Sequence, residues 1–258
     1  MRPAVADAGV TGLCQVEQIM GTAISVELAD DLPYPRLARL ADDVFAWLRL
    51  VDERFSTFKA DSEVNRLDRG DARLADCSHD LRTVVDRCAE LWRETSGYFD
   101  VHATGRLDPS GYVKGWSVQV ASDRLLAAGA ANHCINAGGD VRVRGRTVQG
   151  EPWRVGIRHP WEPLAVCWVV AGTDLAVATS GTYERGYHVV NPFTGAPARD
   201  LRSVTVVGAD LGTADAYATA ALAMGPDALR WLARLDGYES AVVTADGRCF
   251  RSDGLPVA

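Results

Sequence analysis

The sequence lacks a hydrophobic run of transmembrane length, a cluster of cysteines and a run of Lys and Arg. Without about 20 consecutive apolar residues, no segment is expected to insert into a membrane. The six cysteines are scattered and none forms a Cys-x-x-Cys pair, which argues against a disulfide framework or a zinc site and favours a reducing compartment. The formal net charge of −7 argues against a nucleic-acid partner, because no basic stretch reverses it locally.

The N-terminal residues also lack the apolar stretch of a signal peptide, and Asp7 stands where that stretch would be. No hydrophobic stretch precedes Cys14, so a lipoprotein anchor is not expected either, and we predict a cytoplasmic protein. Hydrophobic residues make up 47% of the 258 residues, which is ordinary for a globular protein. We predict an N-terminal tail over 1–12 and one domain over 13–258, because no repeat or low-complexity linker divides the chain.

Hydrophobic periodicity predicts helices that flank a block of strands. Residues 13–28 alternate apolar and polar in two runs, which predicts two strand segments with a bulge or bend at Gly21. Stripes of helical spacing predict helices over 35–53, 79–96 (with Ser78 as N-cap), about 113–128, the segment around Asp215, and 226–235. Short β-rich runs predict strands over 132–136, 140–146, 153–158, 165–171, 175–179, 187–190 and 203–208, and a hairpin over 239–250. The pattern indicates an α+β fold with a mostly antiparallel sheet.

The segment Thr213-Ala-Asp-Ala-Tyr-Ala-Thr219 places a carboxylate and a hydroxyl four residues apart on a predicted helix. Side chains at that spacing lie on one helical face, so Asp215 and Thr219 can point at one target. Two hard oxygen donors suit Mg²⁺, which fills its shell with waters and substrate phosphates. The alternative is structural: Thr213 is an N-cap, and Asp215 complements the positive helix N-terminus.

Two glycine-containing segments are candidates for contact with a ligand. Asn136-Ala-Gly-Gly-Asp140 allows positive φ and close backbone approach, or it is a tight hairpin turn with Asp140 as its cap. Ala178-Thr-Ser-Gly-Thr-Tyr-Glu-Arg185 is either a phosphate-facing loop at the end of a strand or an ordinary turn.

Two further side chains suit chemistry near neutral pH. His188 precedes an Asn-Pro turn and suits a proton shuttle, although a single histidine on a strand is more often structural. Lys114, in the segment Asp108-Pro-Ser-Gly-Tyr-Val-Lys-Gly115, suits a phosphate or a flavin carbonyl, or is a solvated lysine in the first helical turn.

Together, these segments resemble the ApbE family, the FAD:protein FMN transferases. The matching blocks occur in the family's order over roughly residues 20–225. They are Met20-Gly-Thr; Phe55-Ser-Thr-Phe58 with Ser62-Glu-Val-Asn65; Gly97-Tyr-Phe-Asp100; Gly111-Tyr-Val-Lys-Gly115; Asn136-Ala-Gly-Gly-Asp140; Ala178-Thr-Ser-Gly181; His188-Val-Val-Asn-Pro; and Ala214-Asp-Ala-Tyr-Ala-Thr219 with Met224-Gly225.

The resemblance implies a single T-fold-like α+β domain around an FAD pocket. It implies an enzyme that uses Mg²⁺ to split FAD, attaches FMN as a phosphodiester to a threonine of an acceptor flavoprotein, and releases AMP. Asp215 and Thr219 match the family's metal ligands, and Gly111 matches the position that ligates through its carbonyl. His188 matches the histidine proposed to act on the acceptor threonine, and Asp215 shares the catalytic role through the metal. The positions that match FAD contacts are Met20, Phe58, Tyr98, Phe99, Asp100, Asp108, Lys114 and Val189.

The chain departs from the family pattern at three places. Only a few residues separate Asp100 from Asp108, where members usually insert a long helical segment, so we expect a pocket that is more open there. Gln119 and Asn191 replace aspartates and remove negative charge near the predicted site. Two other functions stay open: a Mg²⁺-dependent FAD pyrophosphatase with water as acceptor, and an FAD-binding module without catalysis.

Overall fold

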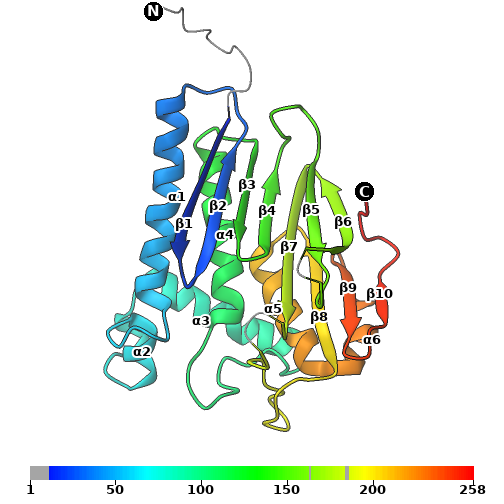
Figure 1. The fold of residues 1–258 in the computed structure, drawn as a ribbon. Coiled ribbons are helices and arrows are strands. Elements are labelled where there is room, and N and C mark those ends of the chain that lie inside the picture. Colours follow the sequence, from blue (N-terminus) through cyan, green and yellow to red (C-terminus); the bar gives the residue numbers. More distant parts are fainter. Residues whose placement is uncertain (1–11, 163, 184–185) are drawn as a thin grey trace, which may run out of the picture.

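The computed structural model describes residues 12–162, 164–183 and 186–258, so the predicted tail lies outside the described residues except for Gly12. The elements are labelled in Figure 1. The helices are α1 (Tyr34–Phe55), α2 (Glu63–Asp68), α3 (His79–Glu94), α4 (Ser110–Ala127), α5 (Leu211–Met224) and α6 (Ala228–Leu232), with 3₁₀ turns at Leu74–Asp76 and Gly225–Asp227. The strands are β1 (Leu13–Ile19), β2 (Thr22–Leu28), β3 (His133–Ala137), β4 (Asp140–Arg144), β5 (Trp153–Arg158), β6 (Val166–Gly172), β7 (Asp174–Gly181), β8 (Leu201–Gly208), β9 (Glu239–Thr244) and β10 (Cys249–Arg251).

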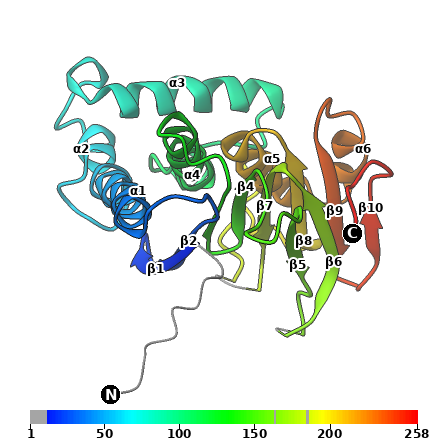
Figure 2. The same ribbon diagram turned by 90° about the horizontal axis from the view of Figure 1, so that it is seen from above.

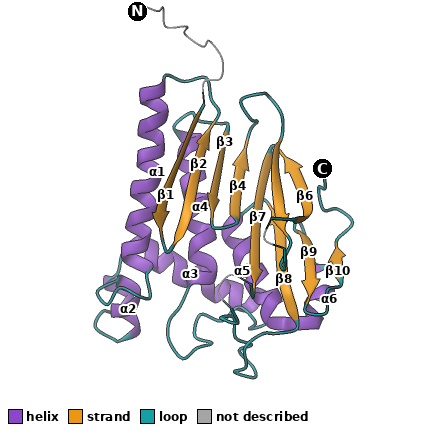
Figure 3. Ribbon diagram, viewed as in Figure 1, coloured by secondary structure: helices purple, strands orange, loops and turns teal. Residues whose placement is uncertain are grey.

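An eight-stranded sheet runs through the molecule in the order β1-β2-β3-β4-β7-β8-β9-β10, and β5 pairs with β6 in a separate two-stranded ribbon. Every pairing in the large sheet is antiparallel. The prediction of an α+β fold with a mostly antiparallel sheet is therefore confirmed (Figure 3). The predicted single domain over 13–258 stays a prediction.

The two faces of the sheet are covered differently (Figure 2). Helices α1, α4 and α5 pack on one face around the larger hydrophobic core, which contains Phe45, Leu48 and Ile135, and α3 lies outside them. The β5–β6 ribbon covers the opposite face over β4, β7 and β8, where Val155 and other valines form a second core. Each fully buried aliphatic or aromatic side chain in these cores contributes about 1.5–3 kcal/mol.

Helix α5 lies inside the protein rather than on its surface. Twelve of its 14 residues are buried and six of the 14 are alanines, so it can approach both the sheet and α4 closely. The N-cap of α5 is Asp210, whose side chain accepts the N–H of Thr213 at 2.7 Å. Thr213 is therefore not the cap, and the structural alternative for this segment is wrong in that respect. Ser78 does cap α3, as predicted, by accepting the N–H of Leu81 at 3.2 Å.

The structure differs from the predicted elements in several places. Met20 and Gly21 have φ of 54° and 72° and form a two-residue hairpin turn, so the chain reverses there instead of bending. Residues 187–190 form no strand; Val190 makes only an isolated bridge to Pro197. The predicted helix over 226–235 is shorter, because Pro226 lies in a 3₁₀ turn before α6. Among the described residues, no helix is long and apolar enough to span a membrane.

Candidate active site

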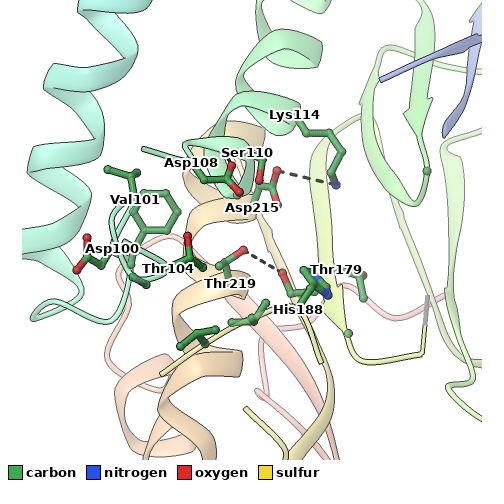
Figure 4. A pocket seen from close by; sticks show the side chains of 18 of the residues that line it. Asp100, Val101, Thr104, Asp108, Ser110, Lys114, Thr179, His188, Asp215 and Thr219 are labelled. Atoms are coloured by element: carbon green, nitrogen blue, oxygen red, sulfur yellow. Dashed lines mark hydrogen bonds and ion pairs between the residues drawn. The ribbon is translucent and has the colours of Figure 1, made fainter. Parts of the chain in front are cut away.

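A cavity of about 330 Å³ lies at the end of the sheet where β2 begins and β7 ends. The loop that follows α3, the first turns of α4, one face of α5 and the segment around His188 close it (Figure 4). The predicted site residues that line it are Tyr98, Phe99, Asp100, Asp108, Gly111, Lys114, His188, Val189, Asp215 and Thr219. Residues from three separate stretches of the chain, 98–114, 188–189 and 215–219, thus meet in one cavity.

Asp215 and Thr219 lie one turn apart on α5 and both face the cavity (Figure 4). Asp215 is buried, and its Oδ2 accepts the backbone N–H of Gly115 at 3.0 Å. The Thr219 hydroxyl lies 3.1 Å from the Ser180 hydroxyl at the end of β7. The Asp215 carboxylate is held by α4 and the Thr219 hydroxyl by β7, so the oxygen atoms of both side chains have fixed positions.

Lys114 reaches into the cavity from α4 between two buried carboxylates. Its ammonium forms an ion pair with Asp140, and its Nζ lies 3.9 Å from Oδ2 of Asp215. Asp140 opens β4 and accepts the N–H of Thr179 at 3.1 Å through its other oxygen. Sequence reasoning treated Asp140 only as a possible turn cap, although its place in the Asn136–Asp140 block marked the segment.

Gly111 brings the backbone of α4 close to Thr219. A Cβ at Gly111 would lie 3.1 Å from Oγ1 of Thr219 and 3.3 Å from the Phe99 ring, so glycine allows this approach. A regular helix pairs the N–H of Gly115 with the carbonyl of Gly111; here the Asp215 carboxylate also accepts that N–H. A carbonyl oxygen has two lone pairs, which leaves the Gly111 carbonyl capacity for a further ligand.

These donors fit Mg²⁺ better than a softer metal. They are a carboxylate, a hydroxyl and a backbone carbonyl, and Mg²⁺ binds through one or two carboxylates and completes its shell with waters and phosphates. In the described part of the chain, no group of three or more His, Cys, Asp or Glu side chains is placed to hold a metal ion. A site of the zinc type would need such a group.

The loop after α3 carries the aromatic residues of the site. Thr95 is buried, and its hydroxyl accepts the N–H of Phe99 at 2.9 Å, which fixes the start of the loop. Tyr98 packs edge-on against Phe193 with ring centroids 4.8 Å apart. Asp100 and Asp108 accept the N–H groups of His102 at 2.8 Å and Ser110 at 3.0 Å, so each carboxylate also shapes its own turn.

The short segment between Asp100 and Asp108 is fastened to α2. Asp68 accepts the N–H of Leu107 at 2.7 Å and the side chain of Arg106 at 3.1 Å. These hydrogen bonds lower the pKa of Asp68 below its ordinary value, and the Leu107 N–H has the largest effect. Helix α2, which the periodicity did not predict, thus fastens the segment that is short by comparison with the family that the sequence resembles.

His188 lines the cavity from an exposed loop rather than from a strand. Its Nδ1 lies 3.1 Å from the carbonyl of Gly186, which can only accept a hydrogen bond. A neutral imidazole that donates through Nδ1 leaves Nε2 as the basic nitrogen. The last two residues of the Ala178–Arg185 motif, 184 and 185, lie outside the described residues.

Two predicted FAD-contacting residues do not line the cavity. Phe58 is 97% exposed and lies in the turn after α1. Met20 packs against the larger hydrophobic core from the β1–β2 turn, while its neighbours Gly21 and Thr22 do line the cavity. Their contact with FAD stays a prediction.

Gln119 and Asn191, which stand where the resembled family has aspartates, make hydrogen bonds within the fold. The Gln119 side chain accepts from Arg142 at 3.0 Å and from the N–H of Leu211 at 3.1 Å. Asn191 accepts the N–H of Phe193 at 2.9 Å and donates to the carbonyl of Ala223 at 3.2 Å. Neither side chain lines the cavity.

A second cavity of about 470 Å³ adjoins the first, and Gly156 and Arg158 of β5 line it together with residues of β1, β2 and β3. The two share Thr22, Gly138, Thr179 and Tyr183. A Cβ at Gly138 would lie 2.4 Å from Oγ1 of Thr22. Glycine therefore allows the turn between β3 and β4 to lie directly against the start of β2, where the two cavities meet. The two cavities together therefore have room for a larger ligand than the first cavity could hold alone.

Known proteins share both the sequence pattern and the fold. The ApbE family model matches residues 20–105 and 101–242. The FAD:protein FMN transferase of Vibrio cholerae is 34% identical over 131 residues, which are 47% of this chain and 39% of that protein. The FAD:protein FMN transferase of Haemophilus influenzae is 24% identical over 298 residues, covering 87% of this chain and 86% of that protein.

Solved structures agree over a longer span. The flavin transferase ApbE of Vibrio cholerae superposes with a TM-score of 0.81 at 23% identity, covering 95% of this chain and 98% of that one. The ApbE protein of Thermotoga maritima gives a TM-score of 0.83 at 22% identity, covering 94% and 97%. These likenesses show the fold, and the family model covers most of the sequence. The chain belongs to the ApbE family.

Proposed function

We propose that this protein is a Mg²⁺-dependent FAD:protein FMN transferase. It would cleave FAD, attach FMN through a phosphodiester to a threonine of an acceptor flavoprotein, and release AMP. The observation that carries the proposal is the meeting of Asp215, Thr219 and Lys114 in one cavity of an ApbE-family chain. Relatives named FAD:protein FMN transferase support the substrate and the kind of acceptor.

The metal would be held by Asp215, Thr219 and the carbonyl of Gly111. When bound, Mg²⁺ neutralises charge that develops on the diphosphate as its P–O bond breaks. Lys114 supplies a further cation at the same cavity, which Thr179 and Ser180 line from β7. An acidic protein that binds a diphosphate needs such local positive charge.

Tyr98 and Phe99 supply flat apolar surface at the cavity. Aromatic side chains stack on or pack against a planar ring system, and FAD has two of these, the isoalloxazine and the adenine. We assign the two aromatics to the orientation of FAD. Asp100, Asp108 and Val189, at the same wall, complete the contacts that the family pattern implies.

His188 is the group that removes the acceptor's proton. The threonine oxygen attacks the FMN phosphorus, the bond from that phosphorus to the AMP oxygen breaks, and AMP leaves. Nε2 of His188 takes the hydroxyl proton, since Nδ1 is directed at the Gly186 carbonyl. The imidazole is exposed, so an acceptor protein can reach it.

The same exposure favours a second candidate, an FAD pyrophosphatase in which water takes the threonine's place. An FAD-binding module without catalysis is the third candidate. The acceptor motif and the cytoplasmic location also stay predictions from the sequence.

Mass spectrometry of acceptor flavoprotein domains incubated with this protein, FAD and Mg²⁺ separates the candidates. We expect an FMN-sized addition on a threonine that disappears with EDTA and with Asp215→Asn. Asp227→Asn, which changes an exposed carboxylate just beyond α5, is the matched control and should retain transfer. FMN and AMP without a modified acceptor would support the pyrophosphatase, and unchanged FAD would support the binding module.

A further inference from the structure

Lys114 stands between two carboxylates that compete for it. Its side chain is 21% exposed, whereas the side chains of Asp140 and Asp215 are 1% and 4% exposed. The ammonium forms its closer ion pair with Asp140 and a longer one, at 3.9 Å, with Oδ2 of Asp215. A lysine on a flexible four-carbon stem can cross such a gap by rotating its own bonds.

The two carboxylates, by contrast, are fixed by the backbone. Asp140 accepts the N–H of Thr179 at 3.1 Å, and its main chain is part of the β3–β4 ladder through Ala137. Asp215 accepts the N–H of Gly115 at 3.0 Å from the neighbouring helix. The lysine is therefore the mobile member of the group, and its position follows the negative charge around it.

We propose that Asp140 holds Lys114 away from Asp215 and thereby keeps Asp215 available to the divalent cation. This inference rests on the proposed function, which places Mg²⁺ on Asp215. An ammonium and a metal ion compete for one carboxylate, and their competition is strong where burial lowers the local dielectric constant. Asp140 keeps the lysine on its own side of the cavity, so the ammonium and the metal ion can both face the diphosphate. Asp140 is a positioning residue in this arrangement and does not ligate the metal.

Binding of Mn²⁺ to the protein without FAD tests the inference directly. Mn²⁺ replaces Mg²⁺ as a paramagnetic probe, and electron paramagnetic resonance measures the free ion. For Asp140→Asn we expect the Kd for Mn²⁺ to rise about tenfold, because the asparagine still accepts from Thr179 but no longer retains the lysine. Lys114→Met alone should bind Mn²⁺ at least as tightly as the wild type.

The double variant Asp140→Asn/Lys114→Met is the decisive one. It removes both charges of a buried pair, which proteins tolerate better than removal of one partner. We expect its Kd for Mn²⁺ to return to the wild-type range. Asp174→Asn is the matched control, because Asp174 also pairs with a buried cation, Arg142, at 2.5 Å but lies outside both cavities.

Two results would overturn the inference. One is an unchanged Kd in Asp140→Asn; the other is a double variant as weak as Asp140→Asn, which would make Asp140 itself a ligand. Failure of the metal site has a different signature, since neither the wild type nor Asp215→Asn would then bind Mn²⁺. That outcome would also remove the basis of the inference.

Discussion

The carboxylate of Asp215 on α5 accepts the backbone N–H of Gly115 on α4 at 3.0 Å. This contact exists because the two helices touch at Gly115: a Cβ there would lie 2.4 Å from the carbonyl oxygen of Leu211 and 2.8 Å from Cβ of Asp215. The helix that carries Lys114 and the helix that carries Asp215 are thus fixed against each other. The relative position of the two charged groups depends on this close approach.

Gly115→Ala is expected to push α4 away from α5. The added methyl meets backbone, which cannot yield as a side chain does, so we expect a loss of about 1–3 kcal/mol in the free energy of unfolding. Urea denaturation measures it. Leu126→Ala, at an exposed position of α4, should change that free energy by less than about 0.5 kcal/mol. Equal stability of Gly115→Ala and the wild type would show that the helices separate without cost.

Thr219 offers a test of the hydroxyl in the proposed metal site. Thr219→Val keeps the shape of the side chain but removes the oxygen that lies 3.1 Å from the Ser180 hydroxyl. We expect the Mg²⁺ concentration for half-maximal AMP release to rise about tenfold, since one ligand is lost. Thr219→Ser retains the hydroxyl and should stay near the wild-type value. If both variants need the same Mg²⁺ concentration, the hydroxyl does not ligate.

His133 makes the stability of the fold depend on pH. Its imidazole is fully buried, 2.7 Å from the Ser122 hydroxyl and 2.8 Å from the Ala130 carbonyl, and burial lowers its pKa to about 4. The unfolded chain takes up this proton near the ordinary pKa of about 6.5, so it binds more protons than the folded protein between these two values. Stability therefore falls as the pH drops from 6.5 toward 4.

We expect this single histidine to remove about 1.5 kcal/mol of unfolding free energy between pH 6.5 and pH 5. Urea denaturation at pH 7, 6 and 5 measures the slope. His133→Gln removes the titrating group, and although it also costs stability at pH 7, its slope over this range should be flatter. A variant slope as steep as that of the wild type would assign the pH dependence to other groups.

Periodicity and spacing predicted the parts of the site that depend on local sequence. Asp215 and Thr219 face one cavity because residues four apart on a helix share a face, and that relation needs no knowledge of the rest of the chain. The strand run over 187–190 was wrong for the converse reason. Its β-type residues stand between Gly186 and the Asn191-Pro192 turn, where the chain finds only one bridge partner.

Contacts between distant segments of the chain could not be predicted from the sequence pattern. Asp140 belongs to a recognisable turn motif, but its pairing with Lys114 requires α4 to pack on β4, and no local signal states that. Gln119 is a second example, in which a residue predicted to affect the site instead makes a long-range contact within the fold. Its departure from the family's aspartate suggested a weaker charged site, whereas the structure uses its amide to hold the buried Arg142.

The position of Gln119 leads to a prediction that separates stability from function. Its Oε1 accepts from Arg142 and from the N–H of Leu211, the first residue of α5, and its amide donates to Asp123 at 3.1 Å. Burial already lowers the pKa of Arg142, so the guanidinium depends on its remaining partners. Gln119→Ala removes one of these and leaves a buried N–H of α5 without its acceptor. We expect a loss of about 2–4 kcal/mol in the free energy of unfolding.

Gln119 lies outside the cavity, so the folded Gln119→Ala protein should bind Mn²⁺ and FAD with wild-type Kd values at a temperature well below its Tm. Gln119→Glu keeps an oxygen for Arg142 and Leu211 and should restore much of the stability, although its charge faces Asp123. Thermal unfolding together with Mn²⁺ titration checks both expectations. If fully folded Gln119→Ala binds Mn²⁺ more weakly than the wild type, Gln119 affects the metal site through the position of α5. Leu211, whose N–H Gln119 accepts, and Asp215 belong to that same helix.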